Sequence, residues 1–162
     1  MANLTLPPAD FCWFCRYLAG HAPCAFVARN DHVAAWVNIR QYERGALLVA
    51  PIRHLPTVFD LDAATLAAVY SEAARVGRAV VEAFGATGLN IFQNNGAHAG
   101  QSIPHHHVHV VPRYATSERR RIFQQEEFTP VQWSTQLETA RRVRAALRAA
   151  ADVGGVARDV GH

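Results

Sequence analysis

Lysine is absent from this chain of 162 residues, because all sixteen of its basic side chains are arginine. This absence excludes Schiff-base chemistry through lysine and the lysine of a phosphate-binding loop. The sequence also lacks an apolar run long enough to span a bilayer, and its first residues show no basic region followed by a hydrophobic core. We therefore expect no membrane partner, no secretory signal and a cytoplasmic location.

Cysteine is scarce, with only three in the chain. Two of them form the motif Cys12-Trp-Phe-Cys15, whose spacing favours metal ligation over a disulfide scaffold. Cys24 falls in an apolar segment and is expected to be a small buried residue. The formal net charge is only +3, and the arginines that crowd after residue 113 are typical of a solvated helix face. We expect no nucleic-acid partner.

The pattern of apolar residues predicts an α+β fold, in which a five-stranded, mostly antiparallel sheet carries one long helix, with a further helix at the C-terminus. A single domain is expected over residues 1–150, with its core at about 10–113 and residues 151–162 as a disordered tail. The predicted strands are Pro23–Arg29 and His32–Val37, which suggest a hairpin, and Ala46–Ile52, Leu89–Phe92 and Ile103–Arg113. A long helix is expected after the candidate caps Asp60 and Asp62, ended by Gly85 and Gly88. An amphipathic helix at about Trp133–Ala150 places Trp133, Leu137, Ala140 and Leu147 on one side and arginines opposite.

The segment Ile103–Arg113 concentrates four of the nine histidines. His105, His107 and His109 recur at every second residue, so in a strand their imidazoles share one face, spaced roughly 6–7 Å apart. His106 then points to the other face. An imidazole with a pKa of about 6.5 can attack phosphorus or, when charged, stabilise phosphoryl oxygens. The pattern alone favours a catalytic row, while a bare metal site and a structural accident stay open.

The stretch Gly100-Gln-Ser-Ile-Pro-His-His-His-Val-His-Val-Val-Pro-Arg113 resembles the signature of the histidine triad (HIT) family. The resemblance extends upstream through Asn94, the long helix, His54, the Leu-Leu-Val-Ala-Pro strand and Asn38. His106 departs from the apolar residue that usually separates the first two histidines. The resemblance implies five antiparallel strands with a long helix, a homodimer, and binding of a purine nucleotide or nucleotide conjugate with cleavage at its α-phosphate.

The resemblance also implies roles for individual residues. His107 would be the nucleophile that takes the nucleotidyl group, His109 would contact the phosphate or leaving-group oxygen, and His105 would complete the triad. The residues that would contact the substrate are Trp36 and Ile39 at the base, Asn38 at the ribose, and Asn94, Gln101 and Ser102 at the phosphate. His98, in the loop before the triad, is a weaker candidate for a phosphate contact, and Glu126 and Glu127 receive no role.

Ala46 stands where many family members carry a further histidine that belongs to the hydrogen-bond network around the triad. We expect this difference to leave nucleotide binding intact. It bears instead on the rate of turnover and on the path that the proton takes. The alternative to an enzyme is therefore a nucleotide-binding module with little or no turnover.

A second constellation combines Cys12, Cys15, His54 and His105. Two thiolates and two imidazoles are a set that zinc favours in closed, tetrahedral structural sites. A subset of histidine triad proteins and the related galactose-1-phosphate uridylyltransferases resemble this arrangement, and the spacing from Pro51 to His54 matches theirs. Zinc would then anchor the N-terminal segment and fix His105. The alternative is a reduced Cys-x-x-Cys motif without metal.

Overall fold

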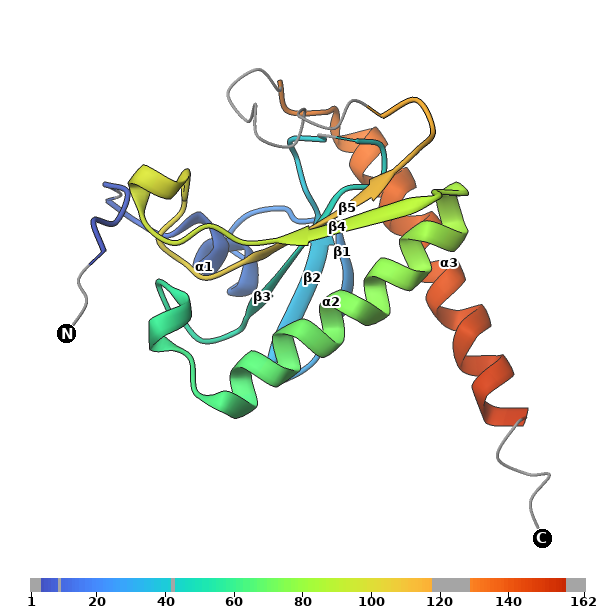
Figure 1. Ribbon diagram of the computed structural model, residues 1–162, viewed down its shortest axis with the longest axis horizontal. Helices are drawn as coiled ribbons and strands as arrows, with labels where there is room; N and C mark the ends of the chain where they lie inside the picture. Colours follow the sequence, from blue (N-terminus) through green and yellow to red (C-terminus); the bar gives the residue numbers. More distant parts are fainter. Residues whose placement is uncertain (1–3, 9, 42, 118–128, 157–162) are drawn as a thin grey trace, which may run out of the picture.

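The computed structural model describes residues 4–8, 10–41, 43–117 and 129–156. Its strands form one sheet in the order β1-β2-β3-β5-β4, in which every neighbouring pair is antiparallel. The predicted fold class is confirmed (Figure 1). The elements are α1 (Trp13–Leu18), β1 (Phe26–Arg29), β2 (Val33–Val37), β3 (Leu47–Pro51), the 3-10 helix η1 (Val58–Asp60), α2 (Ala63–Phe84), β4 (Gly88–Phe92), the 3-10 helix η2 (Ala97–Ala99), β5 (Val108–Arg113) and α3 (Trp133–Val156).

The predicted hairpin of β1 and β2 is present. Its turn is held by the side-chain oxygen of Asn30, which accepts the backbone amides of His32 at 2.8 Å and Val33 at 2.9 Å. Local bonding of this kind is why asparagine favours turns. β1 begins three residues later than predicted, so Cys24 precedes it and is half-buried.

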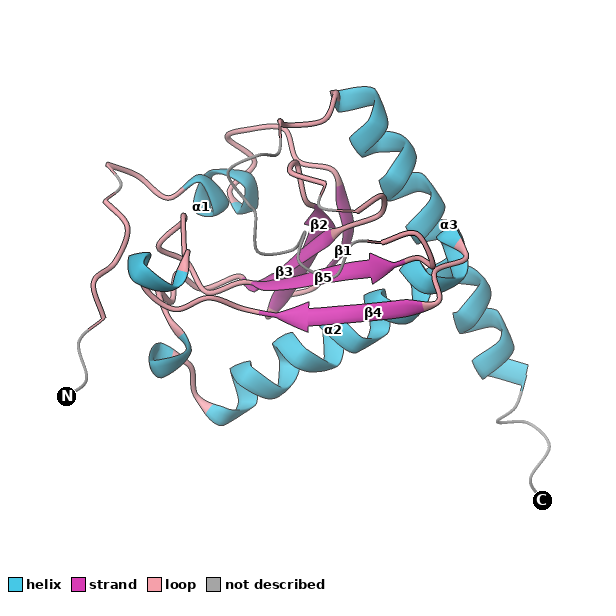
Figure 2. Ribbon diagram, turned by 45° about the horizontal axis from the view of Figure 1, so that its top comes forward, coloured by secondary structure: helices cyan, strands magenta, loops and turns pink. Residues whose placement is uncertain are grey.

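Strands β2 and β3 are buried on both faces, which explains their continuous apolar runs. One face packs against α2 and α3, through residues such as Ala35, Val37 and Val49. The other face carries Trp36 and Leu48 and packs against the short helix α1 (Figure 2). The sheet therefore separates a core on the side of α2 from a second, smaller cluster on the side of α1.

Of the residues predicted at the ends of the long helix α2, Asp62 and Gly85 are the two that cap it. The side chain of Asp62 accepts the backbone amide of Thr65 at 2.7 Å and caps the first turn. Gly85 ends the helix with a φ of 64°, in the left-handed region that glycine adopts without strain. Between these caps, fully buried residues such as Val69 and Val76 form the stripe that covers the sheet.

The helix α3 differs from its prediction in two respects. It runs to Val156 rather than to Ala150, because the alanines at the predicted end are strong helix formers; the remainder of the expected tail, 157–162, lies outside the described residues. Trp133 and Leu137, predicted on one side with Ala140 and Leu147, are exposed by 43% and 42%. The helix contacts the core through Ala140, Val143 and Ala146, and Leu147 packs against it. Across the described ranges, no helix combines the length and apolar character that a membrane crossing requires.

The strand that carries the histidines is shorter than predicted. β5 begins at Val108, so His109 lies in the strand while His105 and His107 precede it. The backbone amide of His105 bonds to the carbonyl of Ile103 at 2.8 Å, and that of His106 bonds to Leu55 at 2.6 Å. These bonds form a bend after Pro104 instead of a ladder with β3.

Candidate active site

A cavity of about 510 Å³ opens on the face of the sheet that carries α1. Six of the residues predicted from the sequence line it: Trp36, Asn38, Ile39, Ser102, His107 and His109. Its other lining residues are Trp13, Phe14, Tyr17, Arg40, Leu48 and Ile103. The cavity therefore joins two imidazoles to a wall that is mainly aromatic and aliphatic, which is typical of small-molecule sites.

His107 is held in one protonation and tautomeric state. Its Nδ1 atom lies 2.7 Å from the carbonyl oxygen of His105. Because a carbonyl only accepts hydrogen bonds, Nδ1 carries the hydrogen, and Nε2 keeps its lone pair. The ring is 4% exposed, and burial lowers the pKa of His107 to about 4. At neutral pH the side chain is thus an uncharged imidazole with a free Nε2, the form that a nucleophile needs.

His109 lies beside His107, with 5.0 Å between the ring centroids. It is paired across the sheet with Leu48 of β3 and Phe92 of β4. Its ring stacks on that of Phe92 at 4.6 Å between centroids, with only 5° between the planes. Burial lowers the pKa of His109 well below its usual value. Both cavity histidines are therefore neutral near pH 7.

His105 turns away from the cavity. Its Nε2 atom donates to the carbonyl oxygen of Pro51 at 3.0 Å, which leaves Nδ1 as the free acceptor. That Nδ1 atom lies 3.5 Å from Sγ of Cys12 and 3.6 Å from Sγ of Cys15. The first histidine of the triad thus belongs to the cysteine cluster, and only the second and third line the cavity.

The four predicted metal ligands come together. The ligand atoms of Cys12, Cys15, His54 and His105 all lie within 4.8 Å of one another, and Nδ1 of His54 is 3.3 Å from Sγ of Cys15. A tetrahedral zinc ion bonded to sulfur and nitrogen separates neighbouring ligand atoms by roughly 3.5 Å. The donor set and its spacing therefore fit zinc.

The thiol of Cys15 resists ionisation in this cluster. Burial, reinforced by the neighbouring Cys12, raises the pKa of Cys15 to about 11. Cys12 also caps α1, since its sulfur accepts the backbone amide of Cys15 at 3.4 Å. A divalent metal would stabilise the thiolate forms and tie the first turn of α1 to His54 and His105.

The predicted phosphate residues divide into two groups. Ser102 is exposed at the edge of the cavity. Gln101 is buried, accepts the amide of Gly96 at 2.7 Å and donates to the carbonyl oxygens of Pro56 and Ile103 at 2.7 and 2.9 Å. The side chain of Asn94 donates to the carbonyl of Gly100 at 3.4 Å. Gln101 and Asn94 do not line the cavity; their bonds shape the loop that presents Ser102.

The wall formed by α1 was missed by the sequence reasoning. Trp13 and Phe14 lie between the two cysteines, and the ring of Phe14 meets that of His107 edge-on at 5.0 Å. The available signal was the Cys-x-x-Cys motif itself. If its cysteines meet His105, the residues between them must approach the histidine segment.

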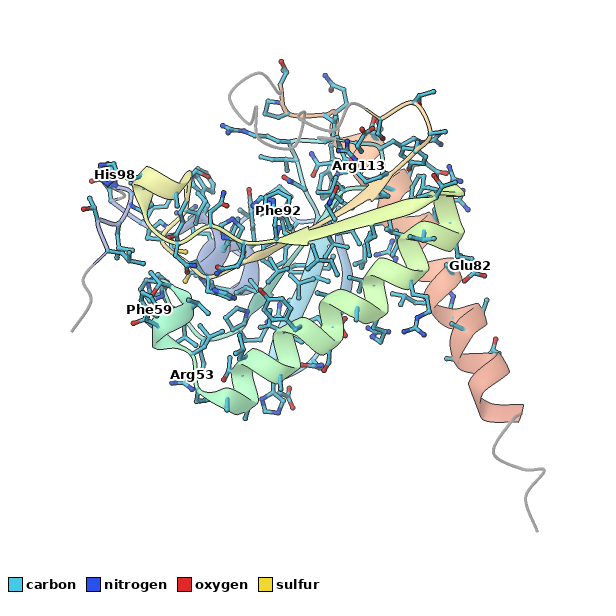
Figure 3. The ribbon with its side chains drawn as sticks, in the orientation of Figure 1. Arg53, Phe59, Glu82, Phe92, His98 and Arg113 are labelled. Atoms are coloured by element: carbon cyan, nitrogen blue, oxygen red, sulfur yellow. The ribbon has the colours of Figure 1, made fainter. Side chains whose placement is uncertain are left out.

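Two further histidines lie outside the cavity. His106 is 1% exposed, and neither ring nitrogen has a hydrogen-bond partner among the described residues. Burial lowers the pKa of His106 to about 4, which keeps it neutral. His98 is exposed on η2, well separated from Phe92 at the sheet, and does not line the cavity (Figure 3).

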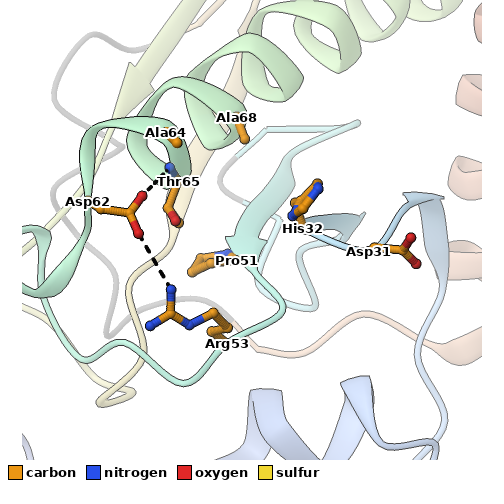
Figure 4. A pocket seen from close by; sticks show the side chains of 8 residues that line it. All are labelled: Asp31, His32, Pro51, Arg53, Asp62, Ala64, Thr65 and Ala68. Carbon is orange, nitrogen blue, oxygen red and sulfur yellow. Dashed lines mark hydrogen bonds and ion pairs between the residues drawn. The ribbon is translucent and has the colours of Figure 1, made fainter.

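A second cavity, of about 320 Å³, lies at the start of α2 (Figure 4). Charges of both signs line it, and Arg53 pairs with Asp62 at 3.5 Å between exposed side chains. Asp62 also caps α2, so the helix N-terminus already has its acceptor. No residue of the triad contributes to this cavity, and we do not assign it the function of the chain.

Sheet order, helix placement and the two imidazoles together define the class as a histidine triad protein, and comparison with known proteins agrees. A model of the HIT domain matches residues 19–116. The chain is similar to the protein hit of Bacillus subtilis, with 37% identity over 106 residues that cover 65% of this chain and 73% of that protein. It is 33% identical over 102 residues to the adenylylsulfatase HINT3 of Arabidopsis thaliana, covering 63% of this chain and 52% of that protein.

A solved structure gives the same result. A zinc-bound histidine triad family protein from Mycobacterium smegmatis matches with a TM-score of 0.75 and 29% identity, covering 88% of this chain and 96% of that chain. This chain belongs to the HIT domain family. The resemblance inferred from the histidine segment is thereby confirmed.

Proposed function

We propose that this protein is a nucleotide hydrolase or nucleotidyl transferase that cleaves purine nucleotide conjugates at the α-phosphate. The observation that carries the proposal is the neutral His107 ring, whose Nδ1 is held by a carbonyl while Nε2 is free. The similarity to an adenylylsulfatase supports the same class of reaction. The leaving group would be an amine, an acyl group or a second nucleotide.

The cavity offers a matching surface for each part of a nucleotide. The base would lie against Trp36 and Ile39, which have aromatic and aliphatic surface suited to a flat ring. Asn38 would bind the ribose through its amide nitrogen, because its side-chain oxygen already accepts the amide of Arg40 at 3.0 Å. The α-phosphate would then lie between His107 and Ser102.

The reaction would proceed in two displacements. Nε2 of His107 attacks the α-phosphorus, and the bond to the leaving group breaks with its electron pair going to that group. His109, beside the attacking ring, donates a hydrogen bond to a phosphoryl or leaving-group oxygen. Water then attacks the phosphorus, the phosphorus–nitrogen bond breaks with its electron pair returning to Nε2, and the proton of the attacking water is released to solvent, which leaves His107 neutral.

We further propose that Cys12, Cys15, His54 and His105 hold a structural zinc ion. The ligand spacing supports this assignment, as does the zinc-bound relative. Bound zinc would supply a cross-link between α1 and the histidine segment. The chemical step would be carried out by His107, not by the zinc. His105 would bind the metal through its ring and hold the ring of His107 through its backbone carbonyl.

A homodimer is the expected assembly. β4 is an edge strand, and its Ile91 is 39% exposed. An edge strand that is paired on one side only and carries an exposed apolar side chain is a ready surface for pairing with a second copy. Light scattering on Ile91→Arg against wild type would test it, and a dimer that persists in the variant would argue against this edge.

The enzyme proposal is tested with a His107→Ala variant and a matched His98→Ala control. Adenosine phosphoramidate, an acyl-adenylate and a dinucleoside polyphosphate are the substrates. We expect turnover to fall roughly 10³-fold or more in His107→Ala and to stay unchanged in His98→Ala. Wild type, but not His107→Ala, should form an acid-labile nucleotidyl adduct visible by mass spectrometry.

The alternative, a binding module with little turnover, is favoured by Ala46 at the position of the usual network histidine. It would be supported if wild type and His107→Ala process all three substrates equally slowly while purine nucleotides still protect both against heat. That outcome would end the enzyme proposal.

A further inference from the structure

The third histidine of the triad stacks on an aromatic residue of the edge strand. Phe92 is the last residue of β4 and is paired with His109 across the sheet. The two rings are almost parallel, with 4.6 Å between centroids and 5° between planes. Side chains of directly paired residues project from the same face of the sheet, so this stack lies on the side of the cavity.

Ala46 belongs to the same cluster. It is fully buried, as is Val111, and Phe92 packs against both. Since Leu48 is paired with His109, the register places Ala46 and Val111 one step farther along the same face. Because the side chain at position 46 is only a methyl group, the ring of Phe92 has room beside His109.

We infer that Phe92 is a positioning residue for His109, and that the pair Ala46 and Phe92 orients this imidazole by stacking. A flat ring lying on one face of the imidazole restricts rotation about its χ2 angle, whose energy wells are otherwise broad. The same ring excludes water from that face. The nitrogen of His109 that meets the substrate is thereby held in one direction.

The inference rests on the proposed function for its effect on turnover, but the orientation of the ring can be measured without substrate. A proton held above or below an aromatic ring is shielded. We therefore expect an upfield-shifted Cε1 proton of His109 in wild-type zinc-loaded protein. The resonance is assigned by its loss in His109→Gln.

Three variants separate stacking from simple packing. Phe92→Leu keeps an apolar side chain but removes the flat ring, Phe92→Tyr keeps the ring, and Phe59→Leu makes the same change at an exposed position on η1. The upfield shift should disappear in Phe92→Leu and remain in Phe92→Tyr and Phe59→Leu.

Turnover provides the second measurement. We expect kcat to fall about 10-fold in Phe92→Leu, since misplacing a catalytic group costs up to ~10²-fold, with KM for the nucleotide substrate unchanged within about twofold. Phe92→Tyr should restore most of kcat. A smaller folded fraction would also lower the apparent kcat at constant KM, so kcat is calculated per folded enzyme, with the folded fraction of each variant taken from urea unfolding.

Two results would overturn the inference. One is a His109 resonance that has the same shift in wild type and Phe92→Leu. The other is an active wild type whose kcat is unaffected by Phe92→Leu, even though the shift changes. If wild type shows no turnover on any substrate, the proposed function fails, and the resonance still decides whether Phe92 orients His109.

Discussion

The Nδ1 atom of His107 lies 2.7 Å from the carbonyl oxygen of His105. The same His105 presents its own Nδ1 to Cys12 and Cys15 at 3.5 and 3.6 Å. One residue therefore takes part in both clusters, through its backbone on the side of the cavity and through its ring on the side of the thiols. A change in the proposed metal site should therefore reach the proposed nucleophile, His107, along this short path.

Loss of metal is expected to weaken nucleotide binding. Trp13 and Phe14 lie between the two cysteines and line the cavity, so releasing Cys12 and Cys15 loosens one wall of it. We expect the Kd for AMP, measured by calorimetry, to rise about 5-fold or more after chelation or in Cys15→Ser, the lower end of common coupling between sites.

Reciprocity gives this prediction a control. If metal improves AMP binding, AMP must improve metal binding by the same factor, measurable by competition with a zinc chelator. Cys24→Ser should change neither value, because Cys24 lies outside the ligand cluster. An equal Kd for AMP with and without zinc would contradict the expected coupling.

Replacing His106 is expected to stabilise the fold. Its ring is buried with both nitrogens unpaired among the described residues, and an unsatisfied buried polar group costs ~1–3 kcal/mol. His106→Leu supplies an apolar side chain of similar size, so the free energy of unfolding in urea should rise by about 1 kcal/mol. A decrease of that size, with His98→Leu unchanged as the exposed control, would show that His106 has a favourable partner.

The spacing of the histidines predicted one shared face for His105, His107 and His109, and this holds for only two of them, because the ring of His105 turns to the cysteines. Alternation placed His107 and His109 together, and they do share the cavity. It could not reveal the bend after Pro104, because that bend depends on a hydrogen bond from His106 to Leu55, a residue from a distant loop. The family resemblance was recoverable because a single contiguous motif carries it, and such a motif can be recognised from local order in the sequence.

The wall of the cavity depends on contacts that are far apart in the chain. Cys12 and His105 are separated by 93 positions, so the approach of Trp13 and Phe14 to the histidines follows only from the metal hypothesis. The stack of Phe92 on His109 required the register of β4 against β5, which no local pattern specifies. The end of α3 was missed because glycines near the C-terminus suggested a tail, whereas the preceding alanines extend the helix.

The cap of α2 predicts a dependence of stability on pH. Hydrogen bonding to the backbone amide of Thr65 lowers the pKa of Asp62, so the ionised carboxylate is favoured in the folded state. The contribution of Asp62 to the free energy of unfolding is therefore fully present above the pKa of the unfolded state, about 3.9. It is lost as the pH falls through the lower pKa of the folded state.

We expect Asp62→Ala to unfold at lower urea concentration than wild type at pH 7, and the difference to shrink below about pH 4. Glu82→Ala, an exposed carboxylate near the other end of the same helix, serves as the control and should not be destabilising at pH 7. A difference between Asp62→Ala and wild type that stays constant from pH 7 to pH 3 would refute the assignment to the charged cap.

Restoring a histidine at position 46 is expected to be unfavourable in this chain. Ala46 is fully buried and packs with Val111 and Phe92, so Ala46→His adds a ring to a filled space, and overpacking typically costs ~1–3 kcal/mol.

In a Phe92→Ala background the space opens, and the same substitution should cost less. The double-mutant cycle, measured by urea unfolding of zinc-loaded protein, should therefore give a favourable coupling of about 0.5 kcal/mol or more. Combining Ala46→His with Phe59→Ala provides the control, since Phe59 is exposed on η1 and its effect should be additive. Additivity with Phe92→Ala as well would mean that Phe92 does not occupy the place that a histidine at position 46 requires.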